Sequence, residues 1–411
     1  MKKLLSVLLA GCMLFGLVAC SGGSSNNGGE TEDGPKIGVI LVGDENEGYT
    51  YAHMEGIKNA AAKLGISDSQ ILWKYNILED ETCHDAAVDL VENKATMVIS
   101  NSYGHQTFMA QAASEYPEVT FVADTGDTAA VSGLPNLKNA FTSVYESRYV
   151  SGVVAGMKIK QLEDEGALVP ENFDENGNVK VGYVGAFPYA EVVSGYTAFY
   201  LGLTSVYPNA VMFVEYTNSW FNVNAEATVG DHLMSMGCVI IGQHADSTGA
   251  PSQLQKNMEE NKYGFTAYSV GYNVSMLDVA PDVALTSASN VWEVFYEYAF
   301  TCWLNGEDMK TDWTGGYNEG AVAITPLGKA VAPGTQEAVD ETIAKIKSGE
   351  IHVFDVSTFK IGGQNPTSIL GDVDADFTPE TECVSDGYFH ESEFRSAPYF
   401  AARIDGITEL N

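Results

Sequence analysis

Basic residues are scarce in this chain. It has 21 lysines and arginines against 55 aspartates and glutamates, a formal net charge of −34 over 411 residues. Nucleic acids and anionic lipid surfaces are bound by basic patches, so this balance excludes a nucleic-acid partner and charge-driven binding to membranes. We interpret the acidity as a solubility feature.

The sequence also lacks the short motifs of common catalytic and metal sites. It has no G-x-S-x-G, P-loop, H-E-x-x-H or C-x-x-C pattern, and no His/Cys cluster with metal-ligand spacing. We therefore expect no catalytic residue, no metal and no cofactor. His244 and Asp246, with Ser247 adjacent, superficially offer a base, an acid and a nucleophile, but residues two apart on a strand do not build a triad by themselves. We interpret them as ligand-binding groups, with a secreted hydrolase as the alternative.

A long apolar run is missing too. The N-terminal run from Leu4 to Ala19 is shorter than the about 20 residues that a transmembrane helix needs. It follows Met1-Lys2-Lys3 and precedes Cys20, which is the layout of a secretory signal, and its end, LVAC, resembles the bacterial lipobox. We expect cleavage of residues 1–19, lipidation of Cys20 and a flexible Ser/Gly/Asn-rich tether over 20–35. The protein would then be exported and held at the cell membrane by the lipid anchor alone. An ordinary signal peptide with an incidental cysteine is the alternative.

Cysteine spacing leaves the redox state of the remaining thiols open. Disulfides Cys83–Cys238 or Cys302–Cys383 would suit an oxidising compartment, and four buried thiols are the alternative.

Short apolar runs alternate with segments of helical periodicity along the chain. The first set has expected strands at 36–42, 71–75, 96–100 and 119–123 and helices at 51–64, 85–92 and 108–116. The second set has strands at 179–184, 210–216, 239–243 and 264–270 and helices at 149–159, 192–206 and 225–236. Such alternation predicts an α/β fold with two doubly wound, parallel-sheet lobes.

Aromatic residues stand beside amides, hydroxyls or carboxylates in the segments after the strands. Ligands of open α/β sheets bind beyond the carboxyl ends of the strands, where flat rings stack on heterocycles and polar groups contact the ring edges. The pattern favours a nucleobase-like ligand. The expected binding residues are Tyr49, Thr50, Ser102, Tyr103, Phe187, Trp220, His244, Asp246, Tyr272, Asn273 and Trp292.

Six ordered stretches carry a family resemblance: GYTYAHMEG, SNSYGHQ, VSGVVAGM, VGYVGAFPYAEVVSGYTAFYLG, TNSWFNVNAEA and GQHADSTGAPSQ. From Ile37 to about Phe359 the chain resembles the basic membrane protein family of ABC-transporter solute-binding lipoproteins, which includes purine nucleoside receptors, and it is most similar to the adenine-binding branch. The resemblance implies a type I periplasmic-binding fold that closes about hinge crossings, purines held between aromatic rings, and delivery to ABC permease subunits.

The expected organisation follows from that fold. Lobe I comprises residues 36–146 and 271–317, lobe II residues 147–270 and 318–362, and residues 363–411 form a C-terminal extension. We expect a monomer. A ligand-sensing receptor that is not coupled to transport would have the same fold and is an alternative to a transport component.

The family's functional residues match this chain unevenly. Tyr49 occupies the place of the stacking aromatic and Thr50 that of a frequent Asn. The nucleoside receptors' first Asp is replaced by the turn Val42-Gly43, their second by Tyr272 with Asn273 next, and their Lys falls near Asn290. The loss of these charged contacts favours a nucleobase, or another flat heterocycle, over a nucleoside.

Overall fold

The computed structural model describes residues 34–411, of which Pro35–Asn411 form one compact unit. The predicted signal peptide, the lipidation of Cys20 and nearly all of the predicted tether lie outside the described residues. Within the described part, no helix combines the length and the apolar character needed to cross a bilayer.

Six parallel strands form the first sheet, in the order β11-β5-β4-β3-β1-β2. They are β1 (Lys36–Ile40), β2 (Ile71–Lys74), β3 (Ala95–Ser100), β4 (Thr120–Asp124), β5 (Leu137–Ala140) and β11 (Asp312–Trp313). The helices are α1 (Gly48–Leu64), α2 (Glu81–Glu92), α3 (Gln106–Glu115) and α8 (Trp292–Asn305). Val39 packs with α1 and α8, whereas Ile40 packs with α2 and α3. The sheet is thus covered on both faces, which explains its continuous apolar runs.

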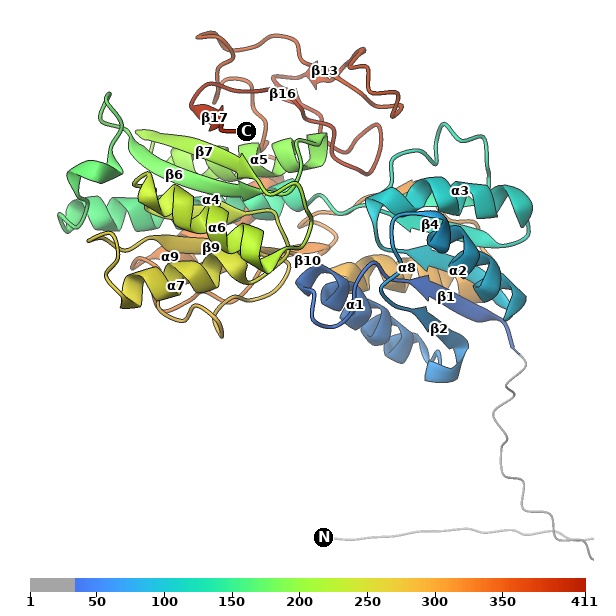
Figure 1. Ribbon diagram of the computed structural model, residues 1–411. Helices are drawn as coiled ribbons and strands as arrows, with labels where there is room; N and C mark the ends of the chain where they lie inside the picture. Colours follow the sequence, from blue (N-terminus) through green and yellow to red (C-terminus); the bar gives the residue numbers. More distant parts are fainter. Residues whose placement is uncertain (1–33) are drawn as a thin grey trace, which may run out of the picture. The chain divides into compact units, whose positions relative to one another are not determined.

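The second sheet has seven strands, in the order β12-β10-β9-β8-β6-β7-β17. They are β6 (Val179–Gly185), β7 (Ala210–Tyr216), β8 (Ile240–Gln243), β9 (Tyr268–Tyr272), β10 (Ala284–Asn290), β12 (Val322–Ile324) and β17 (Ile407–Glu409). Only the edge pair β10–β12 is antiparallel among these pairings. The helices are α4 (Val144–Asp164), α5 (Ala190–Val206), α6 (Val223–Ser235), α7 (Gly249–Glu259) and α9 (Thr335–Ser348). Helices lie on both sides of this sheet as well (Figure 1).

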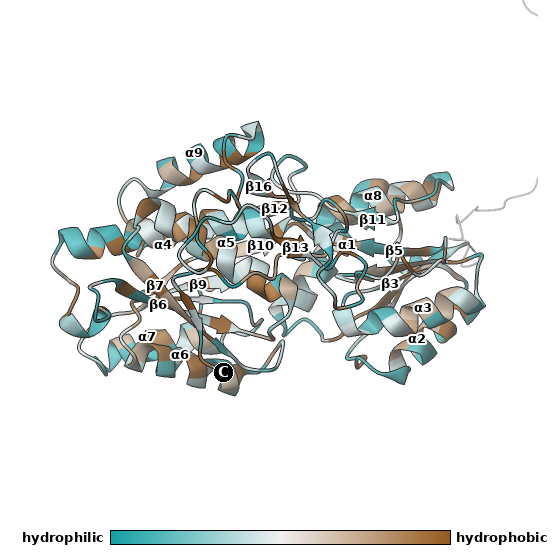
Figure 2. Cartoon of the chain, turned by 90° about the horizontal axis from the view of Figure 1, so that it is seen from above, coloured by the Kyte–Doolittle hydropathy of each residue, from teal (hydrophilic) through white to brown (hydrophobic). Residues whose placement is uncertain are grey.

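Helices α4 and α5 approach each other backbone to backbone. A Cβ atom on Gly202 would lie 1.9 Å from the carbonyl oxygen of Tyr149, and one on Gly152 would lie 2.0 Å from that of Phe199. Any larger side chain would push the helices apart, so the small residues of this stretch are required by packing. Both helices cover the second sheet's largest apolar core, and the strands beneath them are strongly hydrophobic (Figure 2).

Three crossings connect the two sheets: residues 141–143 lead from β5 to α4, Val291 leads from β10 to α8, and residues 314–321 lead from β11 to β12. They are hydrogen-bonded to one another. The backbone N–H of Ser143 donates to the carbonyl of Gly315 at 2.8 Å, and that of Val291 donates to Ala321 at 2.8 Å. We call the elements of the first sheet with α1–α3 and α8 the first half, and those of the second sheet with α4–α7 and α9 the second half.

The expected α/β architecture is confirmed, but the lobe boundaries need correction. Residues 271–317 were assigned as a block to lobe I, whereas β10 within that range pairs in parallel with β9 in the second sheet. The crossing back to the first half comes only at Val291. The Ala/Ser/Thr-rich sequence of β10 gives a weak strand pattern, and its pairing with β9 is what places it.

The expected C-terminal extension, residues 363–411, also joins the second half, because β17 pairs with β7. The short ladders β13 (Leu370–Gly371) with β14 (Thr381–Glu382), and β15 (Val384–Ser385) with β16 (Tyr388–Phe389), lie in the same stretch. Figure 1 shows this segment beside β7 and α5. Short 3-10 turns occur at Asp68–Gln70, Tyr103–His105 and Pro170–Asn172.

Candidate functional site

The predicted ligand-binding residues lie where strands of both halves end. In the first half they follow β1, β3 and β10, and in the second half they follow β6, β7, β8 and β9. A contact joins the two groups: the ring of Tyr103 lies 5.9 Å from that of Tyr189. Parallel sheets place ligand sites at such ends, so this interface is the candidate site.

An aromatic group stands at the rim of the second half. Phe187 stacks on Tyr189 with ring centroids 5.1 Å apart, and Trp220 meets Phe187 edge-on at 4.9 Å. Phe187 and Trp220 are partly buried, while Tyr189 is 46% exposed. Aromatic rings that keep exposed surface at a domain interface offer faces for a planar ligand.

A second aromatic group lies inside the first half. The ring of Trp292 stacks on that of His53 at 4.0 Å, and Tyr49 meets His53 edge-on at 4.6 Å. The hydroxyl of Tyr296 donates to Asp124 Oδ2 at 2.7 Å and also contacts His53 Nδ1. Tyr49 and Trp292 thus lie in one cluster with His53, Tyr296 and Asp124, three residues that were not predicted from the sequence.

Burial sets the protonation of that cluster. It raises the pKa of the Asp124 carboxyl well above its usual range and lowers the pKa of His53 well below. Burial thus disfavours the charged form of both groups. Asp124 Oδ1, His53 Nε2 and Trp292 Nε1 are buried without a hydrogen-bond partner among the described residues. A buried polar atom without a partner costs stability, so these three atoms mark a place where a further hydrogen bond would stabilise the protein.

Arg148 of α4 organises the second half. Its Nη1 donates to the hydroxyl of Tyr183 at 2.8 Å and to the carbonyl of Gln243 at 2.6 Å, and its guanidinium lies 3.8 Å from the ring centre of Tyr272. Nη2 lies 3.2 Å from His244 Nδ1. The side chain is only 2% exposed. Its motif-free sequence context gave no signal of this role.

His244 links Arg148 to a carboxylate. Arg148 is a donor only, so His244 Nδ1 accepts and its Nε2–H donates to Glu191 Oε2 at 2.7 Å. Burial lowers the pKa of His244, Glu191 opposes the shift and Arg148 adds to it. The imidazole is thus held neutral in one tautomer.

Asp246 begins a chain of amide hydrogen bonds. Asn273 Nδ2 donates to Asp246 Oδ1 at 2.7 Å, Asn290 Nδ2 donates to Asn273 Oδ1 at 3.0 Å, and Thr142 Oγ1 donates to Asn290 Oδ1 at 2.5 Å. Burial raises the pKa of Asp246, and the nearby carboxyl groups raise it further. Those neighbours are Glu47, Glu226 and Glu191. A chain from Asp246 to the hinge residue Thr142 couples the site to the crossing.

The remaining predicted residues support loops. Thr50 donates its hydroxyl to Glu47, and Ser102 donates its own to Glu79 Oε1 at 2.6 Å. Ser247 accepts at its hydroxyl from the backbone of Gly249 at 3.0 Å. Because His244 is engaged by Arg148 and Glu191, these contacts differ from those of a Ser–His–Asp triad.

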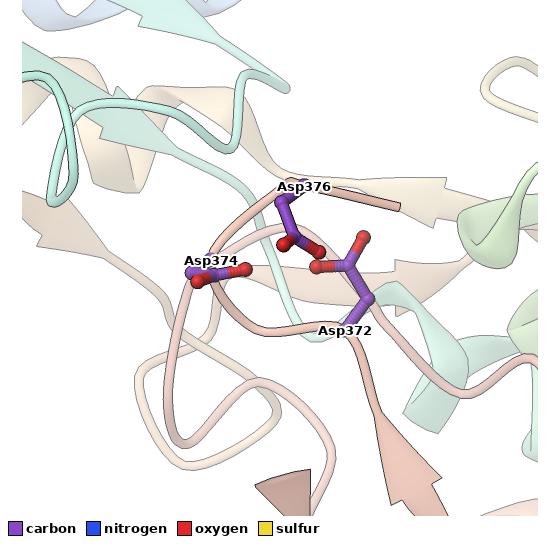
Figure 3. Close-up of side chains that lie close together, drawn as sticks. All are labelled: Asp372, Asp374 and Asp376. Carbon is purple, nitrogen blue, oxygen red and sulfur yellow. The ribbon is translucent and has the colours of Figure 1, made fainter. Parts of the chain in front are cut away.

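Two further features concern ions and thiols. Asp372, Asp374 and Asp376 in the C-terminal segment place carboxylate oxygens within 4.8 Å of one another (Figure 3). Exposed acidic groups of this kind are common without a bound ion, so we assign no metal to them.

Of the two predicted states of the cysteines, the structure has buried free thiols: Cys83, Cys238, Cys302 and Cys383 are all unpaired.

Comparisons with known proteins agree on the class. Residues 35–356 match the family described as ABC transporter substrate-binding protein PnrA-like. A purine-binding protein of Brucella abortus is 28% identical over 79% of this chain and 84% of its own length. A Haloferax volcanii protein named as an ABC transporter glucose-binding protein is 24% identical over 84% of this chain and 80% of its own. An ABC transporter solute-binding protein structure from Aeropyrum pernix superposes with a TM-score of 0.62 at 14% identity, over 81% of this chain and 94% of the other.

Proposed function

Because the chain belongs to the PnrA-like family of ABC transporter substrate-binding proteins, we propose that it captures a purine-like ligand at the interface of its two halves. Substrate-binding proteins of this class bind small molecules and deliver them to ABC permeases. The observation that carries the proposal is the occurrence of partly exposed aromatic rings at the rim of the second half together with buried polar atoms of the first half that have no hydrogen-bond partner among the described residues. The rings of Trp220 and Phe187 lie in the second half, and Asp124 and Trp292 offer unpartnered polar atoms in the first.

The charges around the site narrow the ligand further. Besides burial, the nearby carboxyl groups of Glu47, Glu226 and Glu191 raise the pKa of Asp246 there. Like charges repel, so an anionic ligand such as a nucleotide is disfavoured. Burial favours the protonated form of Asp124 and Asp246, and a protonated carboxyl both donates and accepts, which suits the alternating donors and acceptors of a purine edge. No basic side chain replaces the family's lysine near Asn290, which favours a base over a nucleoside.

Capture proceeds by hinge closure in this proposal. The ligand binds one half first, and its free face then contacts the other, so that its differential contacts favour the closed form. The hydrogen-bonded crossings at Ser143, Val291 and Gly315 form the hinge. The closed monomer then docks on the permease, with Cys20 lipidated and anchored at the cell membrane.

A thermal-shift panel tests the ligand class. Adenine, hypoxanthine and guanine, their nucleosides, AMP, glucose and unrelated heterocycles are added separately to the unit Pro35–Asn411. A ligand in hundredfold excess over its Kd stabilises by about 2.7 kcal/mol, a shift that is readily measured. We expect a base to raise Tm most and AMP to leave it unchanged. A shift with glucose alone would contradict the proposal.

Two alternatives are separated by other observations. A sensor not coupled to transport would bind the same base, and deletion of the permease would leave its cellular response to the base intact. A secreted nucleoside hydrolase would release base from nucleoside, which chromatography of the incubated mixture detects. The engaged state of His244 and Ser247 favours binding over hydrolysis.

A further inference from the structure

The C-terminal tail, residues 357–411, lies beyond the stretch that matches the family. Its body is fixed to the second half. Strand β17 pairs with β7, and the ring of Phe400 stacks on Phe354 with centroids 4.4 Å apart. Phe400 is fully buried. The tail must therefore move with the second half whenever the two halves separate.

One segment of the tail, Glu391–Phe400, is anchored by a buried carboxylate. Glu391 accepts from the hydroxyl of Ser194 on α5 at 2.7 Å and from the backbone N–H groups of Tyr399 and Phe400 at 2.7 and 3.0 Å. The bond to Ser194 ties the segment to the second half, and the other two hold its two ends together. What lies between the ends projects away from this anchor.

That middle part contacts the first half directly. Arg395 Nη1 forms an ion pair with Asp127 Oδ2 at 3.2 Å, and the two side chains are only 5% and 7% exposed. The backbone N–H and hydroxyl of Ser396 both donate to Asp312 Oδ1, at 3.0 and 2.8 Å. Asp127 follows β4 and Asp312 begins β11, so both acceptors belong to the first half.

The same segment reaches the hinge and the candidate site. Ala397 is buried in a small apolar cluster with Phe141 of the first crossing, Val144 at the start of α4, and Tyr272. Asp127, the partner of Arg395, also accepts from the hydroxyl of Tyr103 at 3.3 Å. Asp127 thus links Arg395 to Tyr103, whose ring faces Tyr189 across the interface.

We propose that Glu391–Phe400 is a clasp that holds the halves together, and that Arg395 is a positioning residue of the ligand site, acting through Asp127 and Tyr103. Separation of the halves breaks the Arg395–Asp127 and Ser396–Asp312 contacts and exposes Ala397. The clasp thereby stabilises the closed form even when no ligand is bound. The effect on affinity rests on the proposed function, whereas the effect on closure does not.

Closure is measured without ligand. In the unit Pro35–Asn411, Glu92→Cys on α2 and Lys256→Cys on α7 provide exposed labelling positions on the two halves, and the native cysteines are buried. Pulsed spin-label distances then report the separation. We expect Arg395→Met to raise the open fraction about tenfold. The matched control is Arg403→Met, which removes an ion pair from Arg403 Nε to Glu409 Oε1 at 3.0 Å inside the same tail, and should leave the distances unchanged.

Affinity is measured by calorimetry with adenine. We expect Arg395→Met to weaken binding about tenfold, Asp127→Asn to do the same, and the double variant to be no weaker than either single one, because both remove the same pair. Arg395→Lys should restore part of the loss. Wild-type distances and wild-type affinity in Arg395→Met would overturn the clasp.

Other outcomes are also decisive. If Arg395→Met does not fold, Ser396→Ala deletes only one hydroxyl, and an unchanged open fraction in that variant overturns the clasp. If Arg395→Met opens the protein but adenine binds neither it nor the wild type, the clasp stands and the proposed ligand class fails.

Discussion

In the first half the candidate contacts form a cluster of three rings, Tyr49, His53 and Trp292, whereas in the second half Arg148 and Glu191 hold His244 between opposite charges. The first arrangement removes charge: burial lowers the pKa of His53 and raises that of Asp124. The second keeps charge and compensates it internally. The first half therefore contributes buried groups whose charged forms are disfavoured, and the second half contributes a hydrogen-bonded network that includes a guanidinium and a carboxylate.

Among the variants that test this difference between the halves, we expect the largest effect from Arg148→Met. Loss of the guanidinium leaves the Tyr183 hydroxyl, the Gln243 carbonyl and Glu191 uncompensated in a buried site. Removal of one partner from a buried charge network costs about 3–5 kcal/mol, and urea unfolding should show a loss of this size.

A matched control comes from the first half. Lys63→Met removes an exposed pair with Glu297 (2.6 Å) and should change stability by at most about 1 kcal/mol. Equal losses of unfolding free energy in Arg148→Met and Lys63→Met would mean that the buried hydrogen bonds of Arg148 do not stabilise the second half.

The joint between the halves should show its own pH dependence. Burial raises the pKa of Glu146 to about 7, and its Oε2 accepts from the backbone N–H of Tyr317 at 2.7 Å, which joins the first turn of α4 to the third crossing. A carboxyl with a raised folded pKa holds its proton more tightly when folded, so stability falls as pH rises from about 4.5 through 7. The full loss is about 3 kcal/mol.

Glu146→Gln keeps the accepting oxygen and should flatten this pH window, as measured by urea unfolding between pH 4.5 and 8. Two outcomes would assign the pH dependence to other groups. One is a wild-type free energy of unfolding that rises with pH in this range, and the other is a Glu146→Gln profile with the same slope as wild type.

Trp220→Ala addresses the aromatic surface of the second half. The ring contacts Phe187 and Tyr189 but is only partly buried, so folding should survive its loss. We expect the Kd for the stabilising base to rise at least about tenfold, since stacking on a base is worth about 1–3 kcal/mol. Unchanged affinity in calorimetry would remove Trp220 from the site.

The smallest effect is expected for Asp124→Asn. Burial favours the protonated form of Asp124, which an amide resembles in charge and shape, so stability at pH 7 should change by at most about 1 kcal/mol. A large loss in urea unfolding would instead show an ionised Asp124, and the first half would then resemble the second.

The strands of strong β-branched pattern, such as β1 and β3, were predictable from sequence within one or two residues. Strands β10, β12 and β17 were not, because Ala/Ser/Thr-rich or three-residue segments have little periodicity and are placed by their neighbours. The tail was recognised as a separate segment, but its attachment to both halves depends on contacts across long sequence separations.

The site shows the same division. Tyr49, Trp220 and Asp246 were found because aromatic and polar residues follow strands. Arg148 was missed because it lies within a helix, and Asp124 because it is the last residue of a strand rather than part of a loop. Whether the predicted residues touch the ligand stays a prediction.

The four buried thiols have a practical consequence. Burial raises the pKa of Cys83 and Cys238 to about 12, so almost no thiolate exists at neutral pH. Alkylating reagents can then reach each sulfur only when its surroundings transiently unfold. Cys83 lies in the first half and Cys238 in the second. The alkylation rate of each native cysteine therefore measures how often its own half opens locally.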